Sequence, residues 1–574
     1  MNDRNAAAPP ARRNATVAQA MAAALRRHGV ELVFGQSIPS QLHLAAPECG
    51  IRQVAYRTEN AGAVMADAFA RVSHQVGVVT AQNGPAATLL VPGLAEALTA
   101  SIPLVAIVQD VARGNFDRNA FQELDHLKLF AGCAKWVRRM HTADRVDDYV
   151  DMAFAAAAGG RPGPAVLLVP YDLFGEAAGA APARTASLGR YPLDRVAPDP
   201  AQVAAAADML ARAERPLVVA GGGVHLSDAA PELARLQEVA ALPVATTTMG
   251  KGTVDESHPL AVGVIGYFMG TGGMAKFQRP MIADADVVLF VGTRTNQNGT
   301  DSWTLFPRGA RYIHCDIDGQ EVGRNYEALR LVGDAKLALA ALADALERRD
   351  LLQRQGARRA LAERIADGRR KHLAEAAALL AARGKPARPE RLMAELARRL
   401  SDESIVVADA SYASIWIANY LSARTAGMRF LTPRGLAGLG WGLPMALGAK
   451  LARPDSPVLC VVGDGGFAHV WSELETARRN RLNVVVTVLN NQILGYQKHA
   501  EDVLFGAHTS AIYFEPVDHA AIARACGLNG VRVEDPAEYG PALDRALASD
   551  TATVVDVITD PGAYPPITSF ENRL

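Results

Sequence analysis

Two short motifs in the last third of the chain place oxygen ligands directly behind strands of β-branched and apolar residues. The first ends the segment VLCVVGDGGF, and the second ends the segment VVVTVLNN. Their polar residues and glycines are Gly463, Asp464, Gly465, Gly466, Asn490 and Asn491. The Asp464 carboxylate and the Asn491 amide oxygen are hard ligands. With a backbone carbonyl, phosphate oxygens and a water they would complete the octahedron that Mg²⁺ prefers.

Each motif alone is weak evidence, because GDG is a common turn and NN often caps a helix. Residues 466–489, which separate them, suffice for one helix and one strand. Such a crossover brings both motifs to the same edge of a parallel sheet. Glycine there lets backbone N–H groups approach phosphate closely. The pair therefore predicts a magnesium–diphosphate site.

The elements that must position this site recur along the chain as buried strands alternating with helical patterns. This alternation predicts an α/β protein of three doubly wound parallel-sheet domains. We place the domains at residues 1–185, 195–350 and 385–574, with an Ala- and Pro-rich linker near 178–200. The Ala-, Leu- and Arg-rich stretch 335–385 is expected to form a solvated helical connector.

Composition excludes several classes of function. The 574 residues carry a formal net charge of −1, which gives no strong field for nucleic acid or an anionic membrane. Hydrophobic residues make up 49% and charged residues 21%, as in ordinary globular proteins. No run of apolar residues is long enough to span a membrane. The five scattered cysteines suggest a reducing compartment, so we expect a cytoplasmic protein. Because of the balanced charge and the absence of a long apolar run, we expect neither nucleic-acid nor membrane partners.

In the first block, the segment QVAYRTENAGAVMADAFARV predicts a strand running into a helix, with Glu59 near the junction. A glutamate in the first turn of a helix is often there only because the helix dipole stabilises it. Flanking alanines would bury this carboxyl group, and burial raises the pKa of a glutamate. From its own neighbourhood Glu59 is best explained as a helix-stabilising residue, and a catalytic role for it depends on the GDG–NN pair.

The GDG–NN pair resembles the signature of thiamine-diphosphate enzymes. The whole chain resembles the pyruvate-decarboxylase-type branch of that superfamily, most closely the acetolactate (acetohydroxyacid) synthase catalytic subunit. The similarity is carried by AFQELD (120–125), HCDIDGQEVGRN (314–325), GLAGLGWGLPMALGAK (435–450) and NNQILG. The family arranges pyrimidine-binding, central and diphosphate-binding domains in the order of the three blocks.

The resemblance implies thiamine diphosphate and Mg²⁺ as cofactors. Asp464 and Asn491 would be the side-chain metal ligands, and Ile493 would add its carbonyl oxygen. Glu59 would hydrogen-bond the aminopyrimidine ring and so activate the cofactor. The large side chain of Leu439 would hold the cofactor bent. The remaining expected cofactor-binding residues are Asn83, Gly84, Pro85, Ala410, Ser411, Tyr412, Gly438, Gly463, Gly465, Gly466, Leu494 and Gly495.

Because the family binds the two halves of its cofactor on different domains, it builds each site between two subunits. The implied assembly is a homodimer or homotetramer, with Glu59 from one chain and Asp464 from its neighbour. In the central block, a strand is followed by Gly221–Gly223, and Arg294 lies in a later turn. The family holds FAD there, some relatives use ADP and others leave the site empty, so FAD is an open expectation.

The substrate implied is a small 2-keto acid or a related carbonyl compound. Gln122 corresponds to an active-site residue of the synthase family, as does its neighbour Phe121, and Lys135 corresponds to a lysine near substrate access. The sequence departs from the family at His126 and His499, which we treat as candidate catalytic histidines. It also departs at Ala500, where the synthase carries a tryptophan that helps choose the second keto acid.

Three functions remain open at this point. The first is a carboligase, which decarboxylates a 2-keto acid and joins the fragment to a second carbonyl. The second is a 2-keto-acid decarboxylase, or a 2-hydroxyacyl or acyloin lyase, in which His126 and His499 would help to move protons. The third is a nucleotide-binding regulatory protein descended from such enzymes. The presence of Glu59, Asp464 and Asn491 argues against the third.

Overall fold

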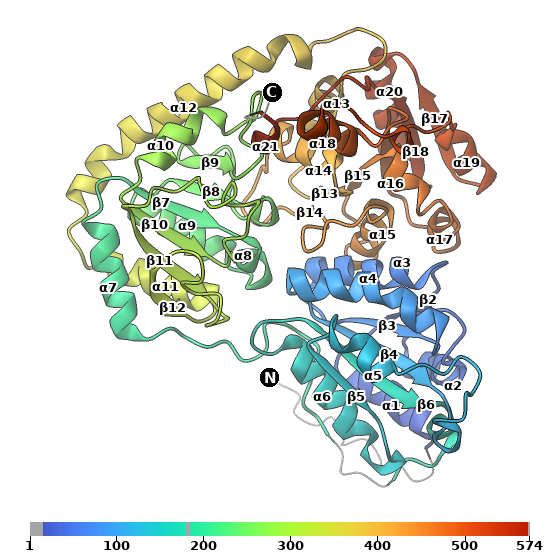
Figure 1. Cartoon of the computed structure of the whole chain (residues 1–574). Helices are drawn as coiled ribbons and strands as arrows, with labels where there is room; N and C mark the ends of the chain where they lie inside the picture. Colours follow the sequence, from blue (N-terminus) through green and yellow to red (C-terminus); the bar gives the residue numbers. More distant parts are fainter. Residues whose placement is uncertain (1–14, 180–183, 572–574) are drawn as a thin grey trace, which may run out of the picture. The chain divides into compact units, whose positions relative to one another are not determined.

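A computed structural model describes residues 15–179 and 184–571, and it contains three six-stranded sheets whose strands are all parallel (Figure 1). The chain divides into two compact units, Met1–Asp194 and Arg195–Leu574, which are described here one at a time. The predicted α/β fold class is thereby confirmed.

The first unit holds one sheet between two layers of helices. Its strands, in sheet order, are β2 (Arg52–Val54), β1 (Leu32–Phe34), β3 (Gly77–Ala81), β4 (Leu104–Asp110), β6 (Pro164–Pro170) and β5 (Trp136–Arg139). Its helices are α1 (Val17–Arg27), α2 (Ser40–Ala45), α3 (Glu59–Ser73), α4 (Pro85–Ala100), α5 (His126–Ala131) and α6 (Val146–Ala158). Every residue of β3, β4 and β6 is buried, because helices cover both faces of a parallel sheet.

The second unit contains the other two sheets. The strands of its first sheet, in sheet order, are β12 (Ala328–Val332), β11 (Arg311–Asp316), β10 (Val287–Val291), β7 (Pro216–Ala220), β8 (Val244–Thr246) and β9 (Ala261–Val264). The helices around it are α7 (Pro200–Ala211), α8 (Gly222–Leu226), α9 (Ala230–Val239), α10 (Arg279–Ala283) and α11 (Ala335–Leu346).

The last sheet carries the GDG and NN motifs. Its strands, in sheet order, are β14 (Phe430–Leu431), β13 (Ile405–Ala408), β15 (Val458–Gly463), β16 (Val485–Asn490), β18 (Thr553–Ile558) and β17 (Asn529–Val533). Its helices are α13 (Pro389–Ala397), α14 (Tyr412–Tyr420), α15 (Gly442–Ala452), α16 (Asp464–Ala468), α17 (Glu473–Arg479), α18 (Gly495–Phe505), α19 (His519–Ala525), α20 (Pro536–Leu547) and α21 (Thr568–Glu571). Because β15 pairs with β16, both motifs leave the sheet at one edge, as predicted.

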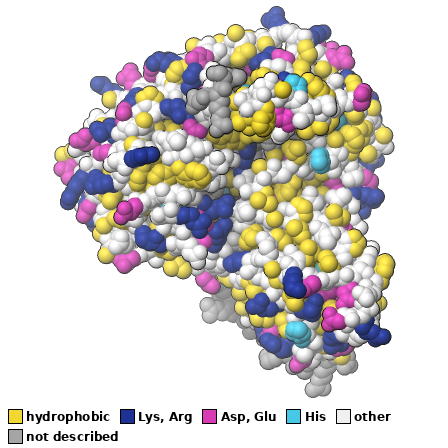
Figure 2. All heavy atoms as spheres, in the orientation of Figure 1, with side chains coloured by type: hydrophobic (Ala, Val, Ile, Leu, Met, Phe, Trp, Pro, Cys, Tyr) yellow, Lys and Arg dark blue, Asp and Glu magenta, His cyan; other side chains and the backbone are white. Residues whose placement is uncertain are grey.

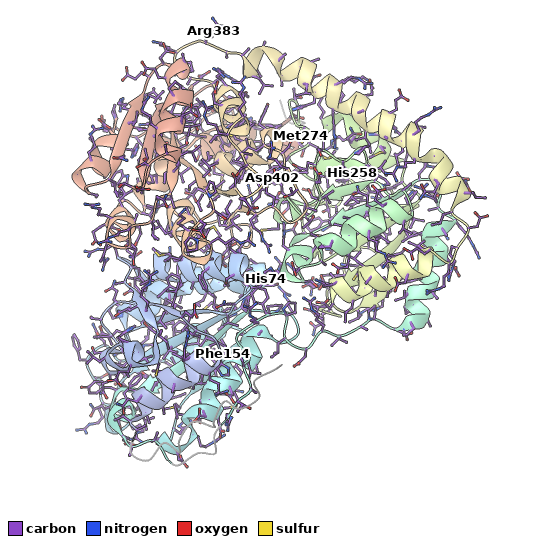
Figure 3. The ribbon with its side chains drawn as sticks, turned by 180° about the vertical axis from the view of Figure 1, so that it is seen from behind. His74, Phe154, His258, Met274, Arg383 and Asp402 are labelled. Carbon is purple, nitrogen blue, oxygen red and sulfur yellow. The ribbon has the colours of Figure 1, made fainter. Side chains whose placement is uncertain are left out.

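Within the second unit, the loops after β9 pack against the last sheet's helices. The backbone N–H of Met274, which Figure 3 labels, donates to the Asn419 side chain of α14 at 3.0 Å. The stretch after α11 forms one long helix, α12 (Leu352–Leu380), and this part of the connector prediction is confirmed. It is not solvated all round, since Ile365 and Gly368 on one face are buried.

The surface agrees with the balanced composition. Basic and acidic side chains are intermixed with apolar ones over both units on the face that Figure 2 shows. No helix in the described part of the chain is long and apolar enough to cross a membrane.

His314 in β11 makes stability depend on pH. Its Nε2–H donates to the Thr293 carbonyl at 2.9 Å, and its Nδ1 accepts from the Gly323 N–H at 3.3 Å, so the buried ring is neutral. Burial lowers the pKa of His314 to about 4. Between pH 6.5 and 4 the His314 imidazole is protonated in the unfolded chain but not in the folded chain. The free energy of unfolding therefore falls as the pH falls through this window.

We expect the free energy of unfolding, and with it the thermal midpoint, to drop over this pH range, and His314→Gln to make the loss of free energy smaller by about 3 kcal/mol. Differential scanning calorimetry at a series of pH values measures this. His141→Gln, at an exposed position, serves as the control. A slope that is the same in His314→Gln as in the parent chain contradicts the account.

Candidate active site

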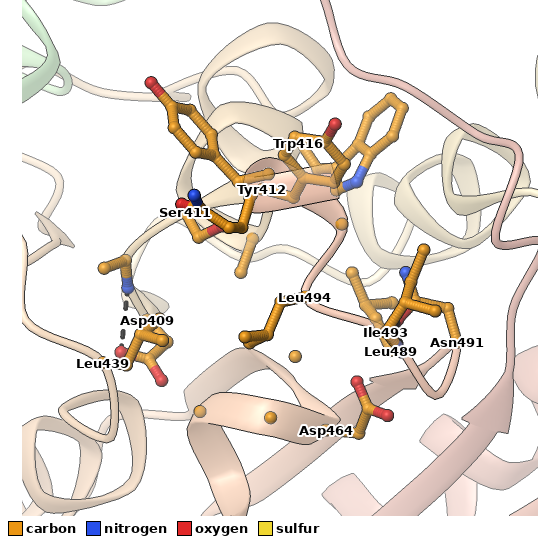
Figure 4. Close-up of a pocket in the computed structure, with 18 of the residues that line it drawn as sticks. Asp409, Ser411, Tyr412, Trp416, Leu439, Asp464, Leu489, Asn491, Ile493 and Leu494 are labelled. Atoms are coloured by element: carbon orange, nitrogen blue, oxygen red, sulfur yellow. Dashed lines mark hydrogen bonds between the residues drawn. The ribbon is translucent and has the colours of Figure 1, made fainter. Parts of the chain in front are cut away.

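The carboxyl ends of β15 and β16 open into a cavity of about 530 Å³ in the second unit (Figure 4). Asp464, the first residue of α16, and Asn491, directly after β16, both line it, as does Ile493. Asp464 accepts the Gln492 N–H at 2.8 Å, and the Asn491 side chain accepts the Ile493 N–H at 3.2 Å. The structure thus brings together the three residues predicted to bind the metal.

The three oxygen ligands offered by Asp464, Asn491 and Ile493, which we call the metal corner, fit Mg²⁺. One carboxylate, one amide oxygen and one backbone carbonyl are hard oxygen ligands that leave room for phosphate oxygens. Burial raises the pKa of Asp464 to about 6, although the Gln492 N–H opposes the shift. A bound cation would favour the ionised form of this carboxyl group. Among the described residues no group of three or more His, Cys, Asp or Glu side chains is arranged to hold a metal.

The glycines of the motif serve packing as well as access. A side chain at Gly466 would place its Cβ 2.2 Å from Asp409 Oδ2, and one at Gly465 would lie 2.8 Å from the Phe514 ring. Gly463 has nothing within 4 Å of the position a Cβ would take, so its backbone faces open space on the cavity wall. All three glycines line the cavity.

Leu439 lines the cavity opposite the metal corner, on a loop that Asp409 fixes. The buried Asp409 carboxylate accepts the N–H groups of Ala410, Gly440 and Trp441 at 2.8, 3.0 and 3.1 Å. Asp409 was not among the predicted site residues, although it stands directly after the buried strand β13. The predicted residue Gly438 is not among the lining residues. A Cβ there would lie 2.7 Å from the Trp441 ring nitrogen, so packing against Trp441 requires glycine.

Ala410, Ser411 and Tyr412 line the cavity at the start of α14, and Leu494 and Gly495 line it at the start of α18. Their contact with the cofactor stays a prediction.

His499 lies beside this wall rather than among the lining residues. Its Nδ1 is 3.0 Å from the Tyr412 hydroxyl, and its ring stacks on Tyr564 with the centroids 4.4 Å apart. Burial lowers the pKa of His499. The geometry gives His499 a role in holding the Tyr412 ring.

In the first unit, Glu59 is the first residue of α3 and is 8% exposed. The Thr58 hydroxyl caps this helix by accepting the Ala61 N–H at 3.4 Å. Burial raises the pKa of Glu59, only partly offset by a backbone hydrogen bond. The predicted strand-to-helix junction therefore exists and supplies a buried carboxyl group whose pKa is raised by burial.

The other predicted residues of the first unit gather after β3. The Asn83 side chain donates to the Gln122 carbonyl at 3.0 Å, and the side chains of Gln82 and Gln122 are 2.7 Å apart. Gly84 adopts φ +64°, where a Cβ would lie 2.7 Å from Gln122, so this turn requires glycine. Pro85 begins α4.

His126 is fully buried, and both of its ring nitrogens are occupied. Nε2 accepts the Gly84 N–H at 2.9 Å, and Nδ1 donates to Asp110 at 3.0 Å. Asp110 also binds Arg139 at 2.9 Å. His126 therefore holds the Gly84 turn. Asp110 and Arg139 escaped the sequence analysis because their only link to His126 is spatial.

Phe121 is 84% exposed in the first unit. Lys135 precedes β5 and donates to the Gly159 carbonyl. That position is the amino edge of the sheet, whereas Gly84 and Glu59 lie at carboxyl ends. Lys135 therefore lies at the opposite edge of the sheet from this cluster, and its place near substrate access stays a prediction.

The glycine turn of the central block is explained by packing. A Cβ at Gly221 or Gly223 would lie 2.3 or 2.6 Å from the Gly292 backbone, and one at Gly222 would lie 3.1 Å from Met249. These glycines allow α8 to approach the end of β10 closely, so they do not by themselves indicate a flavin.

Models of thiamine pyrophosphate enzymes match the chain in three places. The N-terminal TPP binding domain matches residues 15–129, the central domain matches 203–342 and the C-terminal TPP binding domain matches 409–557. The cavity residues from Asp409 to Asn491 fall within the last match. The chain belongs to the thiamine pyrophosphate enzyme family.

Within that family, the chain is similar to acetolactate synthases over nearly its whole length. The probable acetolactate synthase large subunit of Methanocaldococcus jannaschii is 32% identical, over 97% of this chain and 94% of that protein. The large subunit from Parasynechococcus marenigrum is 34% identical, over 94% and 87%. Isozyme 2 of Escherichia coli is 30% identical, over 95% of both chains. The chain is an acetolactate synthase-like enzyme, as the sequence motifs predicted.

Proposed function

We propose that the chain is a magnesium- and thiamine-diphosphate-dependent carboligase that decarboxylates a 2-keto acid and joins the fragment to a second carbonyl compound. The proposal rests on one observation: Asp464, Asn491 and Leu439 line the same cavity at the carboxyl edge of a parallel sheet. Ligands of open α/β sheets bind at this edge. The names of the relatives support the same reaction class.

Each residue has a separate task in this proposal. When bound, the cofactor supplies a nucleophilic carbon that adds to the keto group and accepts the electrons left as CO₂ departs. Asp464 and Asn491, with the Ile493 carbonyl, hold the metal and through it the diphosphate. Leu439 sets the shape of the site, and Glu59 exchanges a proton with the pyrimidine ring nitrogen.

The placement of the histidines favours ligation over the alternative, a decarboxylase or lyase that ends its cycle by protonation. That alternative relied on His126 and His499 as proton donors. His126 is buried with both nitrogens engaged, and His499 is hydrogen-bonded to Tyr412 behind the cavity wall. These contacts give neither ring the proton-donor role that the alternative requires, which supports the carboligase.

His126→Leu should lower stability without removing a proton donor. The variant leaves the buried Gly84 N–H without an acceptor and Asp110 with one donor fewer. This should cost about 1 to 3 kcal/mol and loosen the Gly84 turn. We expect a lower thermal midpoint and a slower enzyme whose pH–rate profile keeps its shape. Loss of one limb of that profile would show instead that His126 acts as an acid or base.

Incubating the purified chain, thiamine diphosphate and Mg²⁺ with a panel of 2-keto acids tests the function. Acetolactate and CO₂ from pyruvate would support the carboligase. Aldehyde without ligation would support the decarboxylase, and neither product would point to the lyase.

We further propose that the enzyme assembles as a homodimer or homotetramer with its sites between subunits. The support is that relatives are named large subunits, and that Glu59 and Asp464 lie in different units of the chain. Light scattering measures the assembly. The visible spectrum of the purified protein decides whether FAD is bound.

A further inference from the structure

The cavity of the second unit has a single basic group among its described lining residues, Arg434. Arg434 follows the edge strand β14 by three positions. Its Nη1 donates to the Tyr267 hydroxyl at 2.9 Å and its Nη2 donates to the Ser414 hydroxyl. The guanidinium also lies over the Phe268 ring, 5.1 Å from the centroid. The side chain is therefore held in one place by neutral partners.

No carboxylate of residues 15–179 or 184–571 lies within salt-bridge distance of Arg434. The acidic residues that share the cavity wall are engaged elsewhere. Asp409 accepts three backbone N–H groups, and Asp560 pairs with Arg388 at 3.1 Å. Asp464 belongs to the metal corner. A partly buried cation without a counter-charge is costly, and an anionic ligand would compensate it.

Two anions could fill this role, the cofactor's diphosphate and a substrate carboxylate. The sheet order is β14-β13-β15-β16, and neighbouring strands are about 4.8 Å apart. The end of β14 is thus two strands from Asp464 and three from Asn491. Tyr267 holds Arg434 from the loop after β9, and Tyr496 of α18 lines the same cavity. This position favours a substrate group over the diphosphate.

The chemistry of the reaction indicates which of the two substrates the Arg434 guanidinium would bind. The donor loses its carboxylate as CO₂, so a cation beside that group would stabilise the charged reactant more than the transition state and slow its loss. The acceptor keeps its carboxylate. The new bond joins the two carbonyl carbons, and the acceptor's carbonyl oxygen takes a proton to become a hydroxyl.

We propose that Arg434 binds the carboxylate of the acceptor and makes the enzyme select 2-keto acids over neutral aldehydes at that step. The proposal rests on the proposed carboligase function. A guanidinium is suited to this task because its planar N–H groups match a carboxylate in shape and charge. The Tyr267 hydroxyl fixes the orientation of the guanidinium.

The test compares Arg434→Gln and Arg434→Lys with Arg424→Gln, which removes an exposed arginine of the same unit. With pyruvate as donor, kcat/KM is measured for 2-ketobutyrate and for propanal as acceptors. We expect the ratio of the two values to fall about 10- to 100-fold in Arg434→Gln and less in Arg434→Lys. The ratio should stay unchanged in Arg424→Gln.

A ratio that Arg434→Gln leaves unchanged overturns the proposal. If affinity for thiamine diphosphate falls instead, Arg434 serves the diphosphate, which overturns it equally. Calorimetric titration of each holoenzyme with oxamate, an unreactive carboxylate, separates this inference from the function. Should the wild type release no CO₂ from any 2-keto acid, the proposed function fails. A 10-fold weaker oxamate affinity in Arg434→Gln would still support the carboxylate site, and equal affinity would refute it.

Discussion

Glu59→Gln should retain thiamine diphosphate and Mg²⁺ but slow exchange of the cofactor's C2 proton by about 10²- to 10⁴-fold. The amide has the size of the carboxyl group but cannot exchange a proton with the ring nitrogen. Burial raises the pKa of Glu59, which makes its protonated form easier to reach than that of an exposed glutamate. Hydrogen–deuterium exchange at C2, followed by NMR after acid quench, measures the rate.

Glu48→Gln, at an exposed position in the same unit, provides the matched control and should exchange at the parent rate. Undiminished exchange in Glu59→Gln would remove Glu59 from proton transfer. Loss of cofactor binding in the same variant would make it a binding residue only.

Asp464→Ala should lose Mg²⁺ and thiamine diphosphate together, with cofactor affinity reduced at least about 100-fold. Asp464 is the one carboxylate of the metal corner, and it also accepts the Gln492 N–H that shapes the loop beside Asn491. Without it, the amide and the carbonyl are neutral ligands for a doubly charged ion. Circular dichroism titration with cofactor at fixed Mg²⁺ measures the affinity.

Asp455→Ala, which removes an exposed carboxylate of the same unit, controls for the loss of charge and should bind as the parent does. Asp464→Asn should bind more weakly than the parent and more tightly than Asp464→Ala. Unchanged affinity in Asp464→Ala would place the metal elsewhere. The Glu59 and Asp464 variants therefore separate activation from binding.

Much of this fold could be predicted because its strands are buried on both faces. Such strands read as unbroken apolar runs, and small or polar residues mark where they end. That pattern located Asp464 and Asn491, and strand pairing placed them side by side. The Glu59 junction was visible as an apolar strand turning into an alanine-rich helix.

The end of the cavity that holds Arg434 could not be predicted in the same way. Arg434, Tyr267 and Asn298 come from loops far apart in the sequence, and only the packing of the two sheets in the second unit brings them to one cavity. Strand β14 has two residues, too few to show a period. The buried face of α12 was also missed, since its few apolar positions are diluted by charged ones.

His126 illustrates a further limit. A histidine at a position where the resembling family has an aliphatic residue or threonine suggests a proton donor. Its partner Asp110 ends β4, and the link between them is spatial. The role of such a histidine follows from what its two nitrogens contact, which no local pattern reveals.

The proposed thiamine-diphosphate-dependent carboligation of 2-keto acids can be measured directly. The most direct measurement is to dialyse the purified protein free of cofactor, add pyruvate, and follow CO₂ and acetolactate with and without added thiamine diphosphate and Mg²⁺. The account predicts that both products appear together and only when both cofactors are present. Binding of both cofactors without either product would contradict it.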